Sequence, residues 1–147
     1  MGTLNTRIAF SDEQAMLLET AMAFCKEKSP IRAVRDLLAS TAGFDRAVWD
    51  AMTALGWSGI AIPERFGGSG LSLAEVATVA EAMGRYLLAT PFGPTQMFIQ
   101  GLLAGGDAAM LAAVLPAIAQ GAVGTVALLE SEGDWDLSRI GDRKSVV

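Results

Sequence analysis

Apolar residues recur at helical spacing near the start of the chain. Ser11 and Gln14 stand three positions apart and can form a capping box, which marks the beginning of a helix. From there, apolar side chains return every three or four residues, at Leu17, Leu18, Ala21, Phe24 and Cys25. This is the period of a helix with one buried face. The pattern ends near Lys28, before Pro30, so we expect the first helix to run from Ser11 to about Lys28.

Two shorter helical patterns follow. One runs from about Ile31 to Leu38, and the other runs from about Asp45 to Leu55 with its apolar residues on one side. Gly56 suits the end of the latter helix, because glycine adopts the left-handed conformation of a C-terminal cap without steric cost. We therefore expect three helices before residue 57.

The stretch from Trp57 to Gly70 is the least helical part of the sequence. It predicts a short extended piece followed by a glycine-rich turn, since glycine permits positive φ angles and close backbone approach. The turn does not match a phosphate-binding loop, because no Gly-Lys-Ser or Gly-Lys-Thr follows. The piece Gly68-Ser69-Gly70 also lacks the third glycine of a dinucleotide-binding motif. We interpret these glycines as structural.

A second capping box opens the next helix. Ser72 and Glu75 form it, and the apolar face that follows extends to Met83. Glu75 and Glu81 are the only acids in this helix. Their positions lie off the apolar face, so we interpret both as solvated surface charges rather than as general bases. No catalytic residue is predicted anywhere in the chain.

Two more helices and one strand complete the pattern. Pro94 suits the first turn of a helix that continues to about Leu103. Asp107 caps a helix towards Ala119, in which Pro116 removes one backbone hydrogen bond and should cause a kink or a tighter last turn.

The pattern then becomes extended from about Gly124 to Leu129, where Val126 and Leu128 alternate with smaller residues. The charged tail from Glu130 to Val147 is expected to be irregular. A lone strand leaves its backbone donors and acceptors unpaired. Either the chain is part of a longer protein, or its end pairs with another chain.

Composition excludes several classes of function. The chain has 147 residues, a formal net charge of -5 and no histidine. A nucleic-acid partner is not expected, because a basic surface is lacking. Without histidine, the usual nucleophile pairs and most zinc or iron sites are also excluded. The single cysteine, Cys25, falls on the apolar face of the first helix and is interpreted as a core residue.

A long uncharged stretch raises the question of a membrane. The 22 residues from Ala108 to Leu129 carry no charge, but Pro116, two glycines and many alanines argue against a spanning helix. We expect a buried helix that breaks at Gly121, and no membrane insertion. The first ten residues lack the apolar core of a secretory signal, so a cytoplasmic location is expected. The mean hydropathy of +0.40 implies that further protein covers apolar surface.

Several short motifs occur together in one order. Leu55-Gly56, Ile62-Pro63-Glu64, Phe66-Gly67-Gly68 and, further on, Glu81-Ala82-Met83-Gly84-Arg85 follow one another at short spacing. In this order they resemble the acyl-CoA dehydrogenase family, and the resemblance covers about residues 8 to 129. It implies an all-α fold, an orthogonal bundle of about five to six helices with one β-strand and an irregular tail at its C-terminus. The implied domains are residues 1–122, the N-terminal helical domain, and residues 123–147, the incomplete start of a middle β-domain.

The resemblance implies a function for the complete protein. Family members bind FAD and remove hydrogen from the α and β carbons of an acyl-CoA thioester, with a glutamate as the base and the flavin as the hydride acceptor. That glutamate belongs to a C-terminal domain that this chain does not contain. The chain is therefore expected to be inactive alone, with acyl-CoA as the substrate of the complete protein, and to assemble as a homo- or hetero-oligomer.

The resemblance also implies sites. Val126, Leu128 and Leu129 match the first flavin-contacting strand of the family, and Ala89, Phe92 and Gln96 match the helix that faces the acyl chain.

Two positions depart from the family pattern. Leu129 stands in place of a threonine whose hydroxyl faces the flavin ring, and Trp135 stands in place of a small serine. These departures favour an alternative, a non-catalytic partner subunit that assembles with a complete acyl-CoA dehydrogenase.

Overall fold

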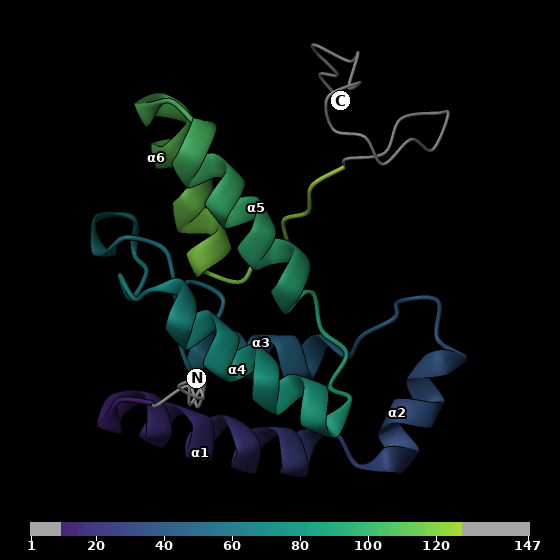
Figure 1. Ribbon diagram of the computed structural model, residues 1–147. Helices are drawn as coiled ribbons and strands as arrows, with labels where there is room; N and C mark the ends of the chain where they lie inside the picture. Colours follow the sequence, from purple (N-terminus) through teal and green to yellow (C-terminus); the bar gives the residue numbers. More distant parts are fainter. Residues whose placement is uncertain (1–9, 128–147) are drawn as a thin grey trace, which may run out of the picture.

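The computed structural model describes residues 10–127 as a bundle of six α-helices (Figure 1). The helices and one short 3-10 helix, η1, are α1 (Asp12–Lys28), α2 (Ile31–Leu38), α3 (Arg46–Ala54), η1 (Glu64–Phe66), α4 (Leu73–Tyr86), α5 (Phe92–Gly105) and α6 (Ala108–Ala119). This confirms the predicted all-α class and the number of helices. In Figure 1, α1 and α4 lie side by side, and α5 and α6 form a second pair above them.

Local side-chain caps explain where the helices begin. Both predicted capping boxes are present, at Ser11 with Gln14 and at Ser72 with Glu75. Asp45 accepts a hydrogen bond from the backbone N–H of Ala47, and Asp107 accepts one from Met110. Each contact satisfies an N–H group that has no partner within the helix.

Left-handed residues explain where three of the helices end. Gly56 after α3 and Gly121 after α6 have φ angles of 79° and 96°. At each site the N–H of the glycine and the N–H of the residue after it donate to carbonyls of the last turn, as in a Schellman motif. Leu87 closes α4 in the same way at φ 54°, where a glycine would be free of the steric cost. The predicted break at Gly121 and the cap at Gly56 are confirmed.

The apolar side chains form two clusters that meet at the loop between α3 and α4. The larger cluster joins α1, α3 and α4, with Trp49 and Met52 fully buried and Cys25 inside it as predicted. The smaller cluster joins α5 and α6 through Ile99 and Leu115. Ile62, in the intervening loop, belongs to the smaller cluster, whereas its neighbours Ile60 and Ala61 belong to the larger one. The loop therefore connects the two halves of the bundle.

Two predictions about the last two helices are confirmed. Pro94 lies in the first turn of α5, which begins at Phe92 with Pro91 at its N-cap. The helix that contains Pro116, α6, begins after Asp107 and continues to Ala119.

The predicted strand from Gly124 is not formed over residues 124–127, which have no regular secondary structure. A single strand has no neighbour here with which to pair. Its last two residues, Leu128 and Leu129, lie outside the described part of the chain.

One helix is poorly buried. None of the residues of α2 is buried, and Leu38 has 85% of its surface exposed. Apolar side chains on such a helix agree with the expectation that additional protein covers part of this domain. Within residues 10–127, no helix is long and apolar enough to cross a membrane.

Candidate functional site

The glycine-rich loop folds back on itself. The carbonyl of Gly59 accepts hydrogen bonds from the N–H groups of Ile62 and Ser69, both at 3.0 Å, and the carbonyl of Ile62 accepts one from Gly70 at 2.8 Å. A Cβ atom on Gly68 would lie 2.1 Å from the carbonyl oxygen of Ile62, which leaves no room for a side chain. The loop therefore needs glycine at position 68 for packing, which agrees with the structural interpretation of these glycines.

The same loop seats against the end of α6. A Cβ on Gly59 would be 3.1 Å from the Cβ of Ala119, so the two backbones approach closely. The buried hydroxyl of Ser58 donates to the carbonyl of Ala119 at 3.0 Å. The motif that carries the family resemblance thus positions the last turn of α6.

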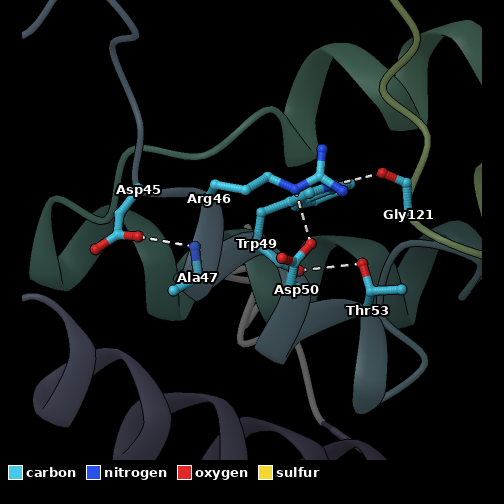
Figure 2. Close-up of polar contacts among 7 residues, drawn as sticks. All are labelled: Asp45, Arg46, Ala47, Trp49, Asp50, Thr53 and Gly121. Atoms are coloured by element: carbon cyan, nitrogen blue, oxygen red, sulfur yellow. Dashed lines mark hydrogen bonds and ion pairs between the residues drawn. The ribbon is translucent and has the colours of Figure 1, made fainter.

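The segment after α6, residues 120–127, is held by two more buried side chains. Figure 2 shows the indole Nε1–H of Trp49 donating to the carbonyl of Gly121, over 2.8 Å. The hydroxyl of Thr95 both donates to the carbonyl of Gly124, at 3.2 Å, and accepts from its N–H, at 3.3 Å. We call residues 120–127 the exit segment, since they carry the chain away from the six helices.

Sequence reasoning missed these contacts. Thr95 lies on the same face of α5 as the apolar residues Phe92, Ile99 and Leu102. A polar residue at such a core position indicates a buried hydrogen bond, and this was the feature of the sequence that could have revealed the contact. Nothing in the local sequence indicates its partner, because Gly124 is 29 residues away.

The predicted substrate-facing residues do not share one surface in the described domain. Ala89 is exposed and lines a cavity of about 280 Å³ with Val34 and Leu37 of α2. Phe92 and Gln96 are buried, with 1% and 4% of their surface exposed. Ala89 therefore lies outside the core, before α5 begins, whereas Phe92 and Gln96 lie within the core.

Gln96 has an unusual environment. Its side-chain amide donates to the carbonyl of Ser58 at 3.0 Å, and more weakly to that of Trp57 at 3.4 Å. Its Oε1 atom has no hydrogen-bond partner among the described residues. A buried acceptor without a partner costs free energy, so Gln96 is a polar residue whose burial needs an explanation.

Of the predicted flavin-contacting residues, only Val126 lies within the described part of the chain. It is 38% exposed and lines a groove of about 410 Å³ with Gly93, Pro94, Met97 and Thr125. Leu128 and Leu129 lie outside the described residues, as does Trp135. The groove has no charged side chain, so it suits an apolar surface.

The acids of α4 have structural contacts. Glu75 accepts hydrogen bonds from the N–H and hydroxyl of Ser72, and from the side-chain amide of Gln14 at 2.8 Å. The hydrogen bonds from Ser72, followed by that from Gln14, lower the pKa of Glu75 to about 2. Glu81 pairs with Arg85 on the helix surface. Neither carboxylate faces a cavity lined for catalysis, and residues 10–127 contain no cluster of acids and cysteine that could hold a metal ion.

Two similar proteins found by comparison with known sequences are acyl-CoA dehydrogenases. The chain is 34% identical over 119 residues to the acyl-CoA dehydrogenase IpdE2 of Mycobacterium tuberculosis, covering 80% of this chain and 37% of the relative. It is 35% identical over 97 residues to IpdE2 of Mycolicibacterium smegmatis, covering 65% of this chain and 31% of the relative. The chain thus spans about a third of the length of these relatives.

Two solved structures share the fold. One is a variant of the Tcur3481-Tcur3483 steroid ACAD, with a TM-score of 0.74 and 27% identity over 82% of this chain and 33% of that one. The other is the ChsE4-ChsE5 complex from Mycobacterium tuberculosis, with a TM-score of 0.72 and 20% identity over 92% of this chain and 35% of that one. At 20% identity, this second likeness shows a shared fold only.

The family model for the N-terminal domain of acyl-CoA dehydrogenases matches residues 11–122, which include all six helices, both capping boxes and the glycine-rich loop. By this match the chain belongs to the acyl-CoA dehydrogenase family, as its N-terminal helical domain.

Proposed function

We propose that this chain is the N-terminal part of a flavin-dependent acyl-CoA dehydrogenase, which oxidises an acyl-CoA thioester between its α and β carbons. The observation that carries the proposal is the loop from Ile62 to Ser72, which has the family's motif and closes on itself through backbone hydrogen bonds. Ile62 enters the smaller apolar cluster, and Ile60 and Ala61, just before it, enter the larger one. The family's catalytic glutamate belongs to its C-terminal domain, and this chain spans about a third of the length of its relatives. We therefore propose that the helical domain has a supporting role and is inactive alone.

The helical domain would form one wall of the substrate site. We propose that Ala89 contacts the acyl-CoA directly, because it is exposed at a cavity whose lining includes Val34 and Leu37 as well as the charged Lys28, Asp36 and Asp45. Phe92 and Gln96 are buried, so we propose that they support this wall and do not contact the substrate. The unpartnered Oε1 of Gln96 would accept a hydrogen bond from a group that reaches it in the complete protein.

FAD would be held mainly by other parts of the protein. Between Arg85 and Glu130 the only charged residue is Asp107, so this region has no cation to bind a diphosphate. We propose that its uncharged groove at Val126 faces the edge of the flavin ring, with backbone groups of Val126 and Leu128 as the contacts. The cofactor supplies the hydride-accepting chemistry when bound, and this domain contributes an apolar boundary.

The proposal is tested with a protein extended along its native reading frame. Purified extended protein should show the visible absorbance of a bound flavin and should reduce an electron-accepting dye when an acyl-CoA is added. The 147-residue chain, as the matched control, should do neither. Extended protein that is colourless and inactive with acyl-CoAs of short, long and steroid-like side chains would exclude the enzyme function.

A second function is favoured by two substitutions. Leu129 and Trp135 replace the threonine and serine that family members place near the flavin, so the complete protein could instead be a non-catalytic subunit. One of the similar structures is named as a complex, ChsE4-ChsE5, and another has the paired name Tcur3481-Tcur3483. We propose this subunit role as the alternative, with a complete acyl-CoA dehydrogenase as its partner.

Co-purification separates the two functions. The extended protein would be co-expressed with an acyl-CoA dehydrogenase encoded next to it, and the complex would be analysed by size-exclusion chromatography. The alternative requires a stable complex in which a catalytic-base variant of the partner abolishes all activity. A flavin-loaded extended protein that is active without the partner would rule it out.

A further inference from the structure

The C-terminal ends of α1 and α4 form a groove with α2 that has no role in the proposed function. Figure 1 shows α2 at the edge of the bundle, beside these two helix ends. The hydroxyl of Ser29, just after α1, donates to the carbonyl of Tyr86 at the end of α4 over 2.9 Å, which holds the two ends together. The groove has a volume of about 320 Å³, and its lining includes Lys26, Ile31, Arg85 and Leu87. We call it the α2 groove.

Apolar side chains at the α2 groove are exposed without an explanation inside the domain. Ile31 and Leu38 are 59% and 85% exposed, and they lie seven positions apart, about two helical turns, on one side of α2. Leu87 is 60% exposed and is the only non-glycine residue of residues 10–127 with a positive φ. That conformation has a steric cost for leucine, and glycine is the usual residue at such a helix end. A strained residue with an exposed apolar side chain indicates a contact outside the domain.

Positive charge is concentrated around the same groove. Lys28 pairs with Glu27, and Arg85 pairs with Glu81. The other three cations of this region form no ion pair with any residue of the range 10–127. No acid is among the residues that line the groove. Residues 10–127 contain seven lysines and arginines, and five of them lie on α2 or on the last turns of α1 and α4, namely Lys26, Lys28, Arg32, Arg35 and Arg85.

Helix dipoles explain only part of this charge. A cation in the last turn of a helix offsets the negative end of the dipole, which accounts for Lys26 and Arg85. Arg32 is the second residue of α2, where the dipole disfavours a cation. The dipole also gives no reason for exposed leucine and isoleucine side chains. Unpaired cations beside exposed apolar side chains are complementary to a partner surface that carries acids and an apolar residue.

We propose that the α2 groove docks an acidic segment of the complete protein, with an apolar side chain against Ile31 and Leu87 and a carboxylate beside Lys26 or Arg32. This inference rests on the proposed function, because it requires the chain to be part of a longer protein. The chain spans about a third of the length of its relatives, so about two thirds of such a protein lie outside it.

A lipid surface fits the α2 groove less well than a protein segment does. Basic sites that bind anionic lipids carry about four to eight lysines and arginines. Here three cations are unpaired among the described residues, in a chain whose formal net charge is -5. The charge is therefore sufficient for a few carboxylates of a protein segment, but it is small for a membrane.

Hydrogen exchange, measured by mass spectrometry on the 147-residue chain and on the extended protein, tests the docking. Amides of residues 31–38 should exchange at least about tenfold more slowly in the extended protein, because a covered α2 opens less often. Arg32→Glu should remove this protection from the extended protein. In the 147-residue chain the same change should leave α2 as stable or more stable, since an acid suits the first turn of a helix. Arg65→Glu is the matched control, because Arg65 lies over Phe66, outside the groove, and it should keep the protection.

Leu87→Gly provides a second variant that does not depend on charge. It relieves the left-handed conformation, so it should not destabilise the 147-residue chain. In the extended protein it should nevertheless accelerate exchange at residues 31–38, because the docked segment loses an apolar contact. A side chain with only a structural role would change both proteins in the same direction.

Equal exchange of residues 31–38 in the two wild-type proteins would overturn the inference, and so would protection that survives both Arg32→Glu and Leu87→Gly. Protection that appears only at concentrations where sedimentation shows a dimer would assign the groove to a second copy and contradict the inference. Protection of the 147-residue chain by vesicles of phosphatidylglycerol and phosphatidylcholine would assign the groove to a lipid surface and would contradict it too.

The two proposals fail separately. A colourless and inactive extended protein with a protected α2 would count only against the enzyme function. An extended protein that is active and loaded with flavin, but in which residues 31–38 exchange as fast as in the 147-residue chain, would count only against the docking.

Discussion

Replacing Gly68 with alanine tests whether the glycine-rich loop joins the two halves of the bundle. The added Cβ would be 2.1 Å from the carbonyl oxygen of Ile62 and 2.6 Å from that of Gly59. An unstrained carbon-oxygen contact is about 3.3 Å or longer, so the backbone must move by about 1 Å. The two carbonyls accept three hydrogen bonds that hold the loop closed. The change is therefore not absorbed by a flexible side chain.

The expected loss can be estimated from these contacts. Overpacking of a tight site costs about 1–3 kcal/mol. Weakening two of the loop's hydrogen bonds adds about 0.5–1.5 kcal/mol each. Together these contributions predict that the free energy of unfolding falls by about 2–6 kcal/mol, a large part of the stability of a typical domain. The largest structural change is expected in the loop itself. Because the loop places Ile60 in the larger apolar cluster and Ile62 in the smaller one, the packing of both clusters should be weakened.

Urea denaturation provides the measurement, with helix content followed by circular dichroism. Gly84→Ala is the matched control, because a Cβ at Gly84 in α4 meets no atom within 4 Å. That control should be more stable than the wild type by about 0.5–1 kcal/mol, since alanine favours the helix. A Gly68→Ala variant that loses less than about 1 kcal/mol would refute the argument from close packing.

Three further predictions concern single side chains. Glu75→Gln should lower stability at neutral pH. Because the pKa of Glu75 is about 2 when folded and 4.5 ordinarily, the carboxylate stabilises the fold above pH 4.5, and this contribution is lost as the pH falls towards 2. Acid titrations of both proteins should therefore converge in that interval, and a constant difference would contradict the assignment. Leu87→Gly should leave stability unchanged or raise it by up to about 1 kcal/mol, because relief of the left-handed conformation outweighs the entropy lost by glycine. Thermal unfolding checks this, and a clear decrease would mean that the exposed Leu87 side chain packs more than its 60% exposure indicates. Cys25 should react very slowly with a thiol reagent in the native chain, because burial raises the pKa of its thiol to about 11. Urea should restore the ordinary rate, and rapid reaction without urea would show that α1 opens readily.

Much of the fold could be predicted because helix boundaries are local. The capping boxes at Ser11 and Ser72 need only residues three positions apart, and the left-handed ends at Gly56 and Gly121 need only one glycine each. The family resemblance was likewise carried by a short continuous segment. These features do not depend on distant parts of the chain, so the amino-acid order alone determines them.

Contacts between distant residues could be found only in the tertiary structure. Trp49 and Gly121 are 72 positions apart, and Gln14 and Glu75 are 61 apart, so no periodicity connects them. The burial of Phe92 and Gln96 depends on how α5 turns towards the other helices, whereas the resemblance indicated only which helix carries them.

The strand expected from Gly124 illustrates the same division. Alternating side chains indicated an extended segment, but a strand also needs a neighbour that supplies hydrogen bonds. In residues 124–127 the neighbour is instead the hydroxyl of Thr95, which bonds to the N–H and the carbonyl of one residue, Gly124. The sequence by itself determined the helices and their ends, because these depend on nearby residues. The tertiary structure decided how the chain leaves them, because that path depends on side chains from three separate elements.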